Sequence, residues 1–293
     1  MKALIIAEHA AAAAELVAGA RTMADEVVAI SFGGAYECGA DKVLNITVPE
    51  GLTVDSAVET VNAAFDAENP EVVLVEACRH MKVIAGSLAF HADTAVITDV
   101  TAFEAEGAKS MYFGGIAERV QKAAGNVAIY TVGAGVLDGA EGANGSVAEQ
   151  EWVAPAHPVK VVSSQVIEKS GVNLFKADVV VAAGRGFAEE SQLSLANDLC
   201  DKLGAGLACS RPLTEGVNWL PTERYVGVSG LMLTPKVYIA AGISGQMQHM
   251  VGCNRSGAIF AINKDKNAPI FKQCDFGLIG DIKDVLPAIT AAL

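Results

Sequence analysis

Polar or glycine-rich residues follow four apolar runs in the second half of the chain, where they could bind an anionic ligand. Open parallel sheets bind ligands beyond the carboxyl ends of their strands, in the loops that lead to the next helices. These strand ends therefore predict one binding site along one edge of a sheet. The run and loop pairs are 178–183 with Gly184-Arg185-Gly186, 207–209 with Ser210-Arg211-Pro212, 237–241 with Gly242-Ile243-Ser244-Gly245, and 258–262 with Asn263-Lys264-Asp265.

The stretch 242–245 favours a phosphate site over a hydrolase nucleophile. A nucleophile elbow needs glycine where this chain has Gln246. The glycines that are present would let backbone N–H groups and the Ser244 hydroxyl approach a pyrophosphate at the start of a helix. The stretch 184–186 lacks the third glycine of a dinucleotide fingerprint, because Glu189 stands in its place. That loop is as typical of a tight turn between strand and helix as of a phosphate contact.

Three side chains near these loops have the chemistry needed to tune a redox cofactor. Arg211 stays charged at any physiological pH and can stabilise a reduced, anionic ring. The Ser229 hydroxyl can donate or accept a hydrogen bond beside a ring nitrogen that gains and loses a proton. His249 follows Gly245 by about one helical turn, so that it can face the same ligand. Each residue also has a structural alternative: a surface ion pair, a turn hydroxyl and a structural imidazole, respectively.

Short apolar runs that alternate with helical patterns predict an α/β fold with two domains, each a mainly parallel sheet flanked by helices. A polar, turn-rich stretch at 163–171 divides the chain into predicted domains of 1–167 and 168–293. The second domain begins with the run at 178–183 and closes with a helix at 281–293. The first domain has strand-like runs at 4–6, 27–30, 71–75 and 95–98, helical patterns at 10–24, 55–67 and 80–91, and segments typical of antiparallel strands at 110–116, 126–134 and 150–163.

The composition excludes several classes of protein and partner. Of the 293 residues, 52% are hydrophobic and 19% are charged, which excludes a disordered chain, a collagen and a coiled coil. The net charge of −13 disfavours nucleic acid and anionic membrane surfaces as partners. The six cysteines form no C-x-x-C motif, so we expect no metal site, and free thiols suit a reducing cytosol. Without a signal-peptide pattern or a run of spanning length, we expect a soluble, cytoplasmic protein with no membrane insertion.

A series of motifs runs through the chain. The first half contains Arg79, Asp99 and Tyr112-Phe113-Gly114-Gly115. The second half contains Cys209-Ser210-Arg211-Pro212, the stretches 224–230, 238–252 and 261–271, Asp275-Phe276-Gly277 and Gly280-Asp281. The series is similar to the α subunit of electron transfer flavoprotein, in the bacterial branch associated with carnitine metabolism and nitrogen fixation. The similarity is close over 178–293, where order and spacing match the family, and looser over 1–165.

The resemblance implies a heterodimeric electron carrier rather than a conventional enzyme. A C-terminal, Rossmann-like domain would bind FAD, the N-terminal domain would contact a β subunit, and electrons would pass from an acyl-CoA-type or other dehydrogenase to a downstream acceptor. Arg211 would lie against the isoalloxazine and stabilise its anionic semiquinone. Ser229 would hydrogen-bond the flavin N5, and His249 would face O2 with a positive charge or an N–H. The protein would thereby tune chemistry that belongs to the cofactor.

The same resemblance assigns the remainder of the cofactor site. Ser244, Gly245 and Gln248 would line the ribityl–pyrophosphate path. Asn263 and Asp281 would hold the adenosine end. The matching motifs add Ser210, Val226 and Gly227 as cofactor-binding residues.

Several alternatives stay open at this point. The resemblance allows a simple electron shuttle or a bifurcating complex with NADH as donor, and the β subunit could hold AMP or a second FAD. A different class of function is an FAD- or NAD-dependent oxidoreductase with its own small substrate, for which His249 is the candidate acid or base. A third is a cofactor-free scaffold, against which the joint presence of Arg211, Ser229 and His249 argues.

Overall fold

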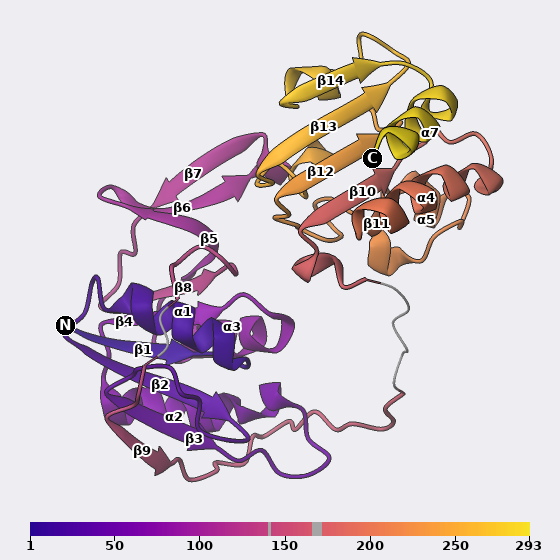
Figure 1. Ribbon diagram of the computed structural model, residues 1–293. Helices are drawn as coiled ribbons and strands as arrows, with labels where there is room; N and C mark the ends of the chain where they lie inside the picture. Colours follow the sequence, from indigo (N-terminus) through magenta and orange to yellow (C-terminus); the bar gives the residue numbers. More distant parts are fainter. Residues whose placement is uncertain (140–141, 166–171) are drawn as a thin grey trace. The chain divides into compact units, whose positions relative to one another are not determined.

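The computed structural model describes residues 1–139, 142–165 and 172–293 (Figure 1). The chain forms two compact units: one comprises Met1–Tyr112 and Ala117–Val166, and the other comprises Phe113–Ile116 and Ile167–Leu293. We call them the N-terminal and the C-terminal unit. The predicted domain boundary between 167 and 168 lies outside the described residues.

One mixed sheet forms the centre of the N-terminal unit, and in the described residues it has nine strands in the order β7-β6-β5-β8-β4-β1-β2-β3-β9. The pairs from β5 through β8, β4, β1, β2 and β3 to β9 are parallel, and β6 and β7 extend the sheet with antiparallel pairs. The strands are β1 (Lys2–Ile6), β2 (Glu26–Phe32), β3 (Lys42–Ile46), β4 (Val72–Glu76), β5 (Val96–Glu104), β6 (Gly107–Tyr112), β7 (Ala117–Gln121), β8 (Ala128–Val132) and β9 (Ser146–Glu149).

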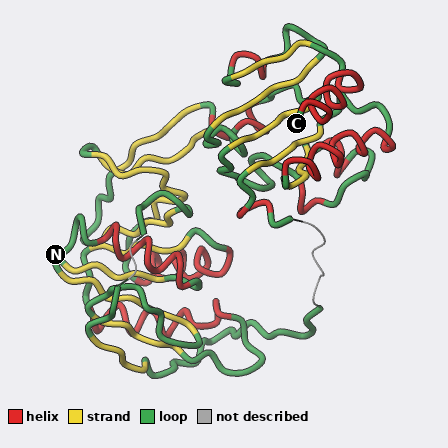
Figure 2. The backbone as a smooth tube through the Cα atoms, viewed as in Figure 1, coloured by secondary structure: helices red, strands yellow, loops and turns green. Residues whose placement is uncertain are grey.

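Helices cover both faces of this sheet (Figure 2). The alternation of side chains along β1 sends Ala3 and Ile5 to one face, where α1 (Ala10–Ala20) packs, and Leu4 and Ile6 to the other, where α2 (Val58–Glu68) and α3 (Arg79–His91) pack. A strand buried on both faces is expected to be apolar throughout, as β1 is. A short 3₁₀ turn, η1 (Val54–Ala57), also belongs to this unit, whereas η2 (Phe113–Gly115) and η3 (Leu174–Lys176) belong to the C-terminal unit.

Two of the predicted antiparallel segments are wrong. Within 126–134, β8 pairs in parallel with both β4 and β5, because the chain returns from the β6–β7 hairpin and inserts β8 between them. The described segment 150–163 holds no strand, only an isolated antiparallel bridge between Leu52 and Lys160. Pro155 and Pro158 lack the amide N–H that a continuous ladder needs. The prediction for 110–116 is confirmed in part, since β6 pairs with β5 and β7 in antiparallel register.

The C-terminal unit is a smaller, wholly parallel sheet in the order β11-β10-β12-β13-β14. Strands β10 (Val179–Ala183), β11 (Gly206–Cys209), β12 (Val237–Ala241) and β13 (Ala258–Asn263) match the predicted runs, whereas β14 (Phe276–Ile279) was not predicted. The first strand of this unit, β10, lies between β11 and β12, so the chain adds its next strands on opposite sides of β10. Crevices at such a topological switch point are where doubly wound sheets bind ligands.

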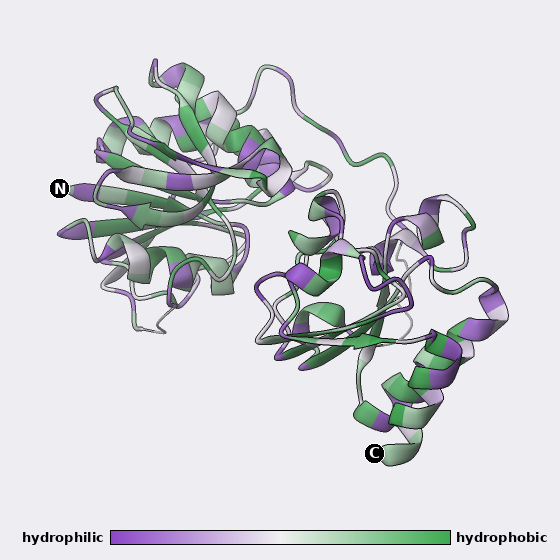
Figure 3. Ribbon diagram, turned by 90° about the horizontal axis from the view of Figure 1, so that it is seen from above, coloured by the Kyte–Doolittle hydropathy of each residue, from purple (hydrophilic) through white to green (hydrophobic). Residues whose placement is uncertain are grey.

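The two faces of this second sheet are covered differently. Helices α4 (Leu193–Leu203) and α7 (Ile282–Ala292) pack together over one face. Loops and short helices cover the other, among them α6 (Met247–Met250), which is a single turn. Figure 3 shows apolar residues along the central strands of each sheet. The remaining short elements are α5 (Pro212–Glu215), η4 (Glu190–Gln192), η5 (Thr222–Arg224) and η6 (Pro269–Lys272).

The predicted fold class is therefore confirmed: both units are α/β, each with a mainly parallel sheet flanked by helices. Across the residues that the structure describes, every helix is too short or too polar to cross a bilayer.

Candidate functional site

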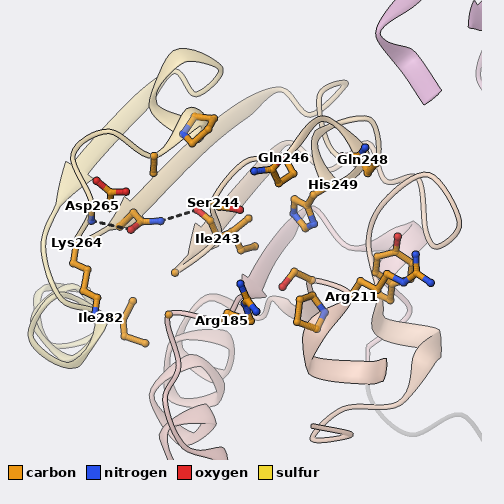
Figure 4. A pocket seen from close by; sticks show the side chains of 18 of the residues that line it. Arg185, Arg211, Ile243, Ser244, Gln246, Gln248, His249, Lys264, Asp265 and Ile282 are labelled. Atoms are coloured by element: carbon orange, nitrogen blue, oxygen red, sulfur yellow. Dashed lines mark hydrogen bonds between the residues drawn. The ribbon is translucent and has the colours of Figure 1, made fainter. Parts of the chain in front are cut away.

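A cavity of about 610 Å³ opens at the carboxyl ends of the C-terminal strands. Its wall contains residues from the loops that follow β10, β11, β12 and β13, which are the strand ends predicted to share one site. The volume lies within the range of small-molecule and cofactor sites. In Figure 4, Lys264 lies toward one end of the cavity and Arg211 toward the other, with Arg185 and His249 between them.

Most of the predicted site residues border this cavity. Val226, Gly227 and Gly245 do not line it and lie in the protein behind its wall. The eight predicted residues that the structure brings to the wall are Ser210, Arg211, Ser229, Ser244, Gln248, His249, Asn263 and Asp281.

Glycines allow two of the loops to touch backbone to backbone. The Gly186 N–H donates to the Gly242 carbonyl oxygen at 2.9 Å. A Cβ on Gly186 would lie 2.5 Å from Gly242 Cα, and Gly242 has a φ of +66°. Any larger residue would push the loops after β10 and β12 apart. The two glycines of 184–186 thus allow this close contact. The side chain of Arg185, which lies between them, lines the cavity.

Gly245 supports the cavity wall from behind. Its φ is +82°, and a Cβ there would lie 2.5 Å from the backbone N and Cα of Ile270. The Ile270 N–H donates to the Ser244 carbonyl oxygen at 3.0 Å, and the Gln273 side chain donates to the Gly245 carbonyl oxygen at 3.1 Å. The loop that carries Ser244 is therefore held against the η6 segment.

Cationic side chains give the cavity an affinity for anions. Arg185 and Lys264 are exposed at the wall, and neither forms an ion pair within the described residues. Arg211 instead donates from Nε to Glu215 Oε2 at 2.6 Å, with 59% of its side chain exposed. In a protein of net charge −13, two cations without a carboxylate partner mark this wall as a favourable place for phosphate groups.

His249 is a buried titratable group of the wall, with 7% of the residue exposed. Its Nε2 lies 3.0 Å from the Tyr238 hydroxyl. Nδ1 is also buried and has no partner in full hydrogen-bond geometry among the described residues. Burial lowers the pKa of His249 to about 4, which the Val226 backbone offsets slightly. The imidazole is consequently neutral at pH 7. Of the two roles predicted for His249, a positive charge or an N–H, its surroundings favour the N–H.

Ser229 is held at the wall by a tight loop between residues 225 and 231. The Leu231 N–H donates to the Tyr225 carbonyl oxygen at 2.7 Å, and the Val226 N–H donates to the Cys209 carbonyl oxygen at 2.9 Å. The first bond closes the loop, and the second attaches it to the end of β11. The Ser229 hydroxyl lies 3.3 Å from the Tyr225 hydroxyl, which also lines the cavity. A ligand could therefore replace the Tyr225 hydroxyl as the hydrogen-bond partner of Ser229.

Asn263 and Asp281 have structural partners in addition to their place at the wall. The Asn263 side chain donates to the Ile243 carbonyl oxygen at 2.9 Å and accepts from the Asp265 N–H at 2.9 Å (Figure 4). Asp281 is the N-cap of α7 and accepts from the Lys283 N–H at 3.0 Å. Both residues thus fix the loops that surround one end of the cavity, whether or not they also contact a ligand.

Several residues of the wall were not predicted as cofactor contacts. They include the apolar Pro269 and Ile282, Ile243 from the predicted loop after β12, and the polar side chains of Tyr225 and Gln246. Ile243 carries a usable signal, because it lies two residues beyond the end of β12. Ile282 carries none, because only the packing of α7 brings it to the carboxyl edge of the sheet.

The wall suits FAD, the cofactor that the sequence resemblance implies. A buried imidazole nitrogen without a complete hydrogen bond, two cations without ion-pair partners, and hydroxyl and amide side chains beside apolar ones match a ligand with a polar ring, a pyrophosphate and sugar hydroxyls.

Comparison with known proteins gives two matching family models. Residues 3–157 match the electron transfer flavoprotein domain, and residues 173–254 match the electron transfer flavoprotein FAD-binding domain. The chain is also similar to the protein FixB of Escherichia coli O157:H7 and to that of Shigella flexneri. Each is 38% identical to it, in an alignment that covers 95% of this chain and 94% of the relative.

Proposed function

The chain belongs to the electron transfer flavoprotein α-subunit family, in the branch of protein FixB, and we propose on this premise that it carries electrons from a partner dehydrogenase to a downstream acceptor. Residues 173–254 of its C-terminal unit match the FAD-binding domain of that family. FAD supplies the one-electron chemistry when bound, and the protein supplies binding, orientation and electrostatics.

One observation carries the proposal. Eight residues expected to contact FAD, drawn from five separate stretches of sequence, border a single cavity at the switch point of the C-terminal sheet. The FAD-binding family model covers the loops after β10, β11 and β12 that form most of this wall. Agreement between the family's domain and this cavity supports FAD as its ligand.

Different residues of the wall would contact the pyrophosphate and the flavin ring. Arg185 and Lys264, the cations without ion-pair partners, would neutralise the pyrophosphate. Arg211, Ser229 and His249 would surround the ring, with one permanent cation and two hydrogen-bonding groups. Because an arginine keeps its charge at every physiological pH, Arg211 would favour the anionic form of the singly reduced flavin.

We further propose that the functional unit is a heterodimer with a β subunit. The chain aligns along nearly its whole length with FixB proteins and contains both family domains. Whether the pair is a simple shuttle or a bifurcating complex with NADH as donor depends on how many flavins it holds.

The test uses the chain co-expressed and co-purified with a β subunit. We expect a yellow complex, and one FAD per pair for a shuttle or two for a bifurcating complex. Stepwise reduction should produce the red, anionic singly reduced flavin. A complex without flavin would overturn the proposal, and a blue neutral radical would contradict the role of Arg211.

Arg211→Ala gives the matching variant. It should lower the midpoint potential of the flavin or release FAD, because a cation near the ring is removed. Lys236→Ala removes an exposed cation of the same unit whose partner is Asp178, and it should change neither property. Equal behaviour of the two variants would exclude Arg211 from the ring environment.

The alternative, an oxidoreductase with its own small substrate, has less support. It needs an acid or base beside the ring, and His249 was its candidate. A buried imidazole with a pKa of about 4 is a poor proton donor or acceptor near pH 7.

A further inference from the structure

A fully buried tyrosine contacts the imidazole of His249 on the side of its Nε2. Tyr238 lies in β12 with no exposed surface, and its hydroxyl oxygen is 3.0 Å from His249 Nε2. The ring centroids are 6.1 Å apart. Tyr238 does not line the cavity, whereas His249 does. The tyrosine therefore acts on any ligand only through the histidine.

The direction of this hydrogen bond follows from the protons available. Burial raises the pKa of Tyr238 well above its usual value, so the hydroxyl keeps its proton. If Nε2 donated, that proton would need another acceptor. Cys253 and Cys209 are the titratable side chains beside Tyr238, and sulfur accepts weakly. The Cys253 Sγ is itself placed to donate toward the His249 carbonyl oxygen at 3.9 Å. The phenolic O–H consequently donates to Nε2, which must be unprotonated.

The position of the ring proton follows from the role of Nε2. A neutral imidazole carries one N–H, and with Nε2 acting as an acceptor the proton is on Nδ1. Nδ1 is buried and has no hydrogen-bond partner among the described residues. A donor without a partner is thus held at the cavity wall.

We propose that Tyr238 is a positioning residue that fixes His249 in the tautomer with its proton on Nδ1, so that the cavity meets a neutral imidazole in one orientation. That this tautomer serves FAD rests on the proposed function. The tautomer itself rests only on the contacts of this chain.

Without the Tyr238 hydroxyl, Nε2 would be buried and unpaired. The ring could then exchange tautomers, or take up a proton when an anionic ligand is bound. The fixed charges of the cavity wall would change the affinity of the ring for that proton. The charged residues of the wall are Arg185, Arg211, Lys264, Asp265 and Asp281, and the titratable groups packed against Tyr238 are Cys209 and Cys253.

The direct test is nitrogen NMR of the full chain, with and without FAD, after labelling the imidazole nitrogens. The chain has five histidines, and His249→Gln identifies the signals of His249. At pH 7 we expect a protonated Nδ1 and an unprotonated Nε2, with no titration between pH 8 and pH 5. A proton on Nε2, or an imidazolium at pH 7, would overturn the inference.

Tyr238→Phe tests the role of the hydroxyl. The variant should retain FAD with a Kd raised by at most about tenfold, the size of one hydrogen bond. Its His249 signals should show mixed tautomers or titrate between pH 5 and pH 8. Over the same range its flavin potential should vary with pH differently from that of the wild type. Unchanged signals and an unchanged potential profile would show that Tyr238 does not position His249.

Cys253→Ala is the matched control. Cys253 packs beside the same pair, and its Sγ lies 3.9 Å from the His249 carbonyl oxygen. Its removal leaves the Tyr238 hydroxyl in place, so the wild-type tautomer should persist. Should Tyr238→Phe fail to fold, the wild-type spectrum alone decides the inference. Failure of the wild-type chain to bind FAD, alongside the expected spectrum, would overturn the proposed function and leave the tautomer assignment standing.

Discussion

The guanidinium of Arg211 donates from Nε to a carboxylate oxygen of Glu215 at 2.6 Å, one turn along the short helix α5. The two side chains are 59% and 48% exposed. Arg211 borders the cavity and Glu215 does not. A carboxylate just outside the site therefore competes with any anionic ligand for this cation.

Glu215→Gln should strengthen FAD binding by up to about fivefold at low salt, because the variant removes an exposed ion pair that competes for the Arg211 cation. The gain should shrink as salt screens the charges. Titration of flavin fluorescence measures it. Asp178→Asn breaks the exposed pair with Lys236 and makes the same change of net charge elsewhere in the unit. An equal gain from that variant would mean that only net charge matters.

Gly245→Ala should destabilise the C-terminal unit more than Gly204→Ala. Both glycines have positive φ, +82° and +61°, so both substitutions meet the left-handed penalty of about 1–2 kcal/mol. Only at Gly245 would the new Cβ collide with a backbone, that of Ile270, while the space around Gly204 is open. The collision should add about 1–3 kcal/mol.

Urea unfolding measures this difference. Trp219 in the C-terminal unit reports the transition once Trp152 in the N-terminal unit is changed to Phe. Similar free energies of unfolding for the two alanine variants would show that the loop after β12 relaxes away from Ile270 without cost.

Substitutions of Asp281 should separate its capping role from any contact with the ligand. Asp281→Ala removes the bond from the Lys283 N–H and should cost about 1 kcal/mol of stability, whereas Asp281→Asn retains the cap and should cost little. If Asp281 also contacts FAD through its charge, Asn will weaken binding while leaving the melting temperature nearly unchanged. Loss of FAD affinity only in the alanine variant would assign Asp281 a purely structural role.

Burial of His249 should make the stability of the free chain fall on mild acidification. The pKa is about 4 in the folded protein and about 6.5 in the unfolded chain. Between these values the unfolded chain binds more protons, so stability is present above pH 6.5 and is lost as the pH falls toward 4. The full contribution is about 3 kcal/mol, and about half of it should disappear between pH 7 and pH 5.

Urea unfolding of the wild type and of His249→Gln at pH 7 and pH 5 isolates this effect. The variant should lose less stability than the wild type over the same interval. An identical loss would show that His249 titrates normally in the folded protein.

The positions of several strands and of the binding edge follow from local patterns in the sequence. Apolar runs at 178–183 and 237–241 are strands because β-branched and alanine residues form the buried centre of a parallel sheet. The polar residues after each run had to meet at one edge, because parallel strands end on the same side of a sheet. Arg211, Ser244 and Asn263 could therefore be placed around one cavity without coordinates.

Other features depend on contacts between distant segments, which local patterns do not contain. β8 is parallel because it inserts between β4 and β5, and its own residues do not specify its neighbours. Gly245 lies behind the wall because Ile270 packs against it. The charge of His249 was not determined by its position in the motif, because a pKa depends on the solvent and partners around the ring. Burial beside Tyr238 makes that imidazole neutral, and only the tertiary structure brings the two side chains together.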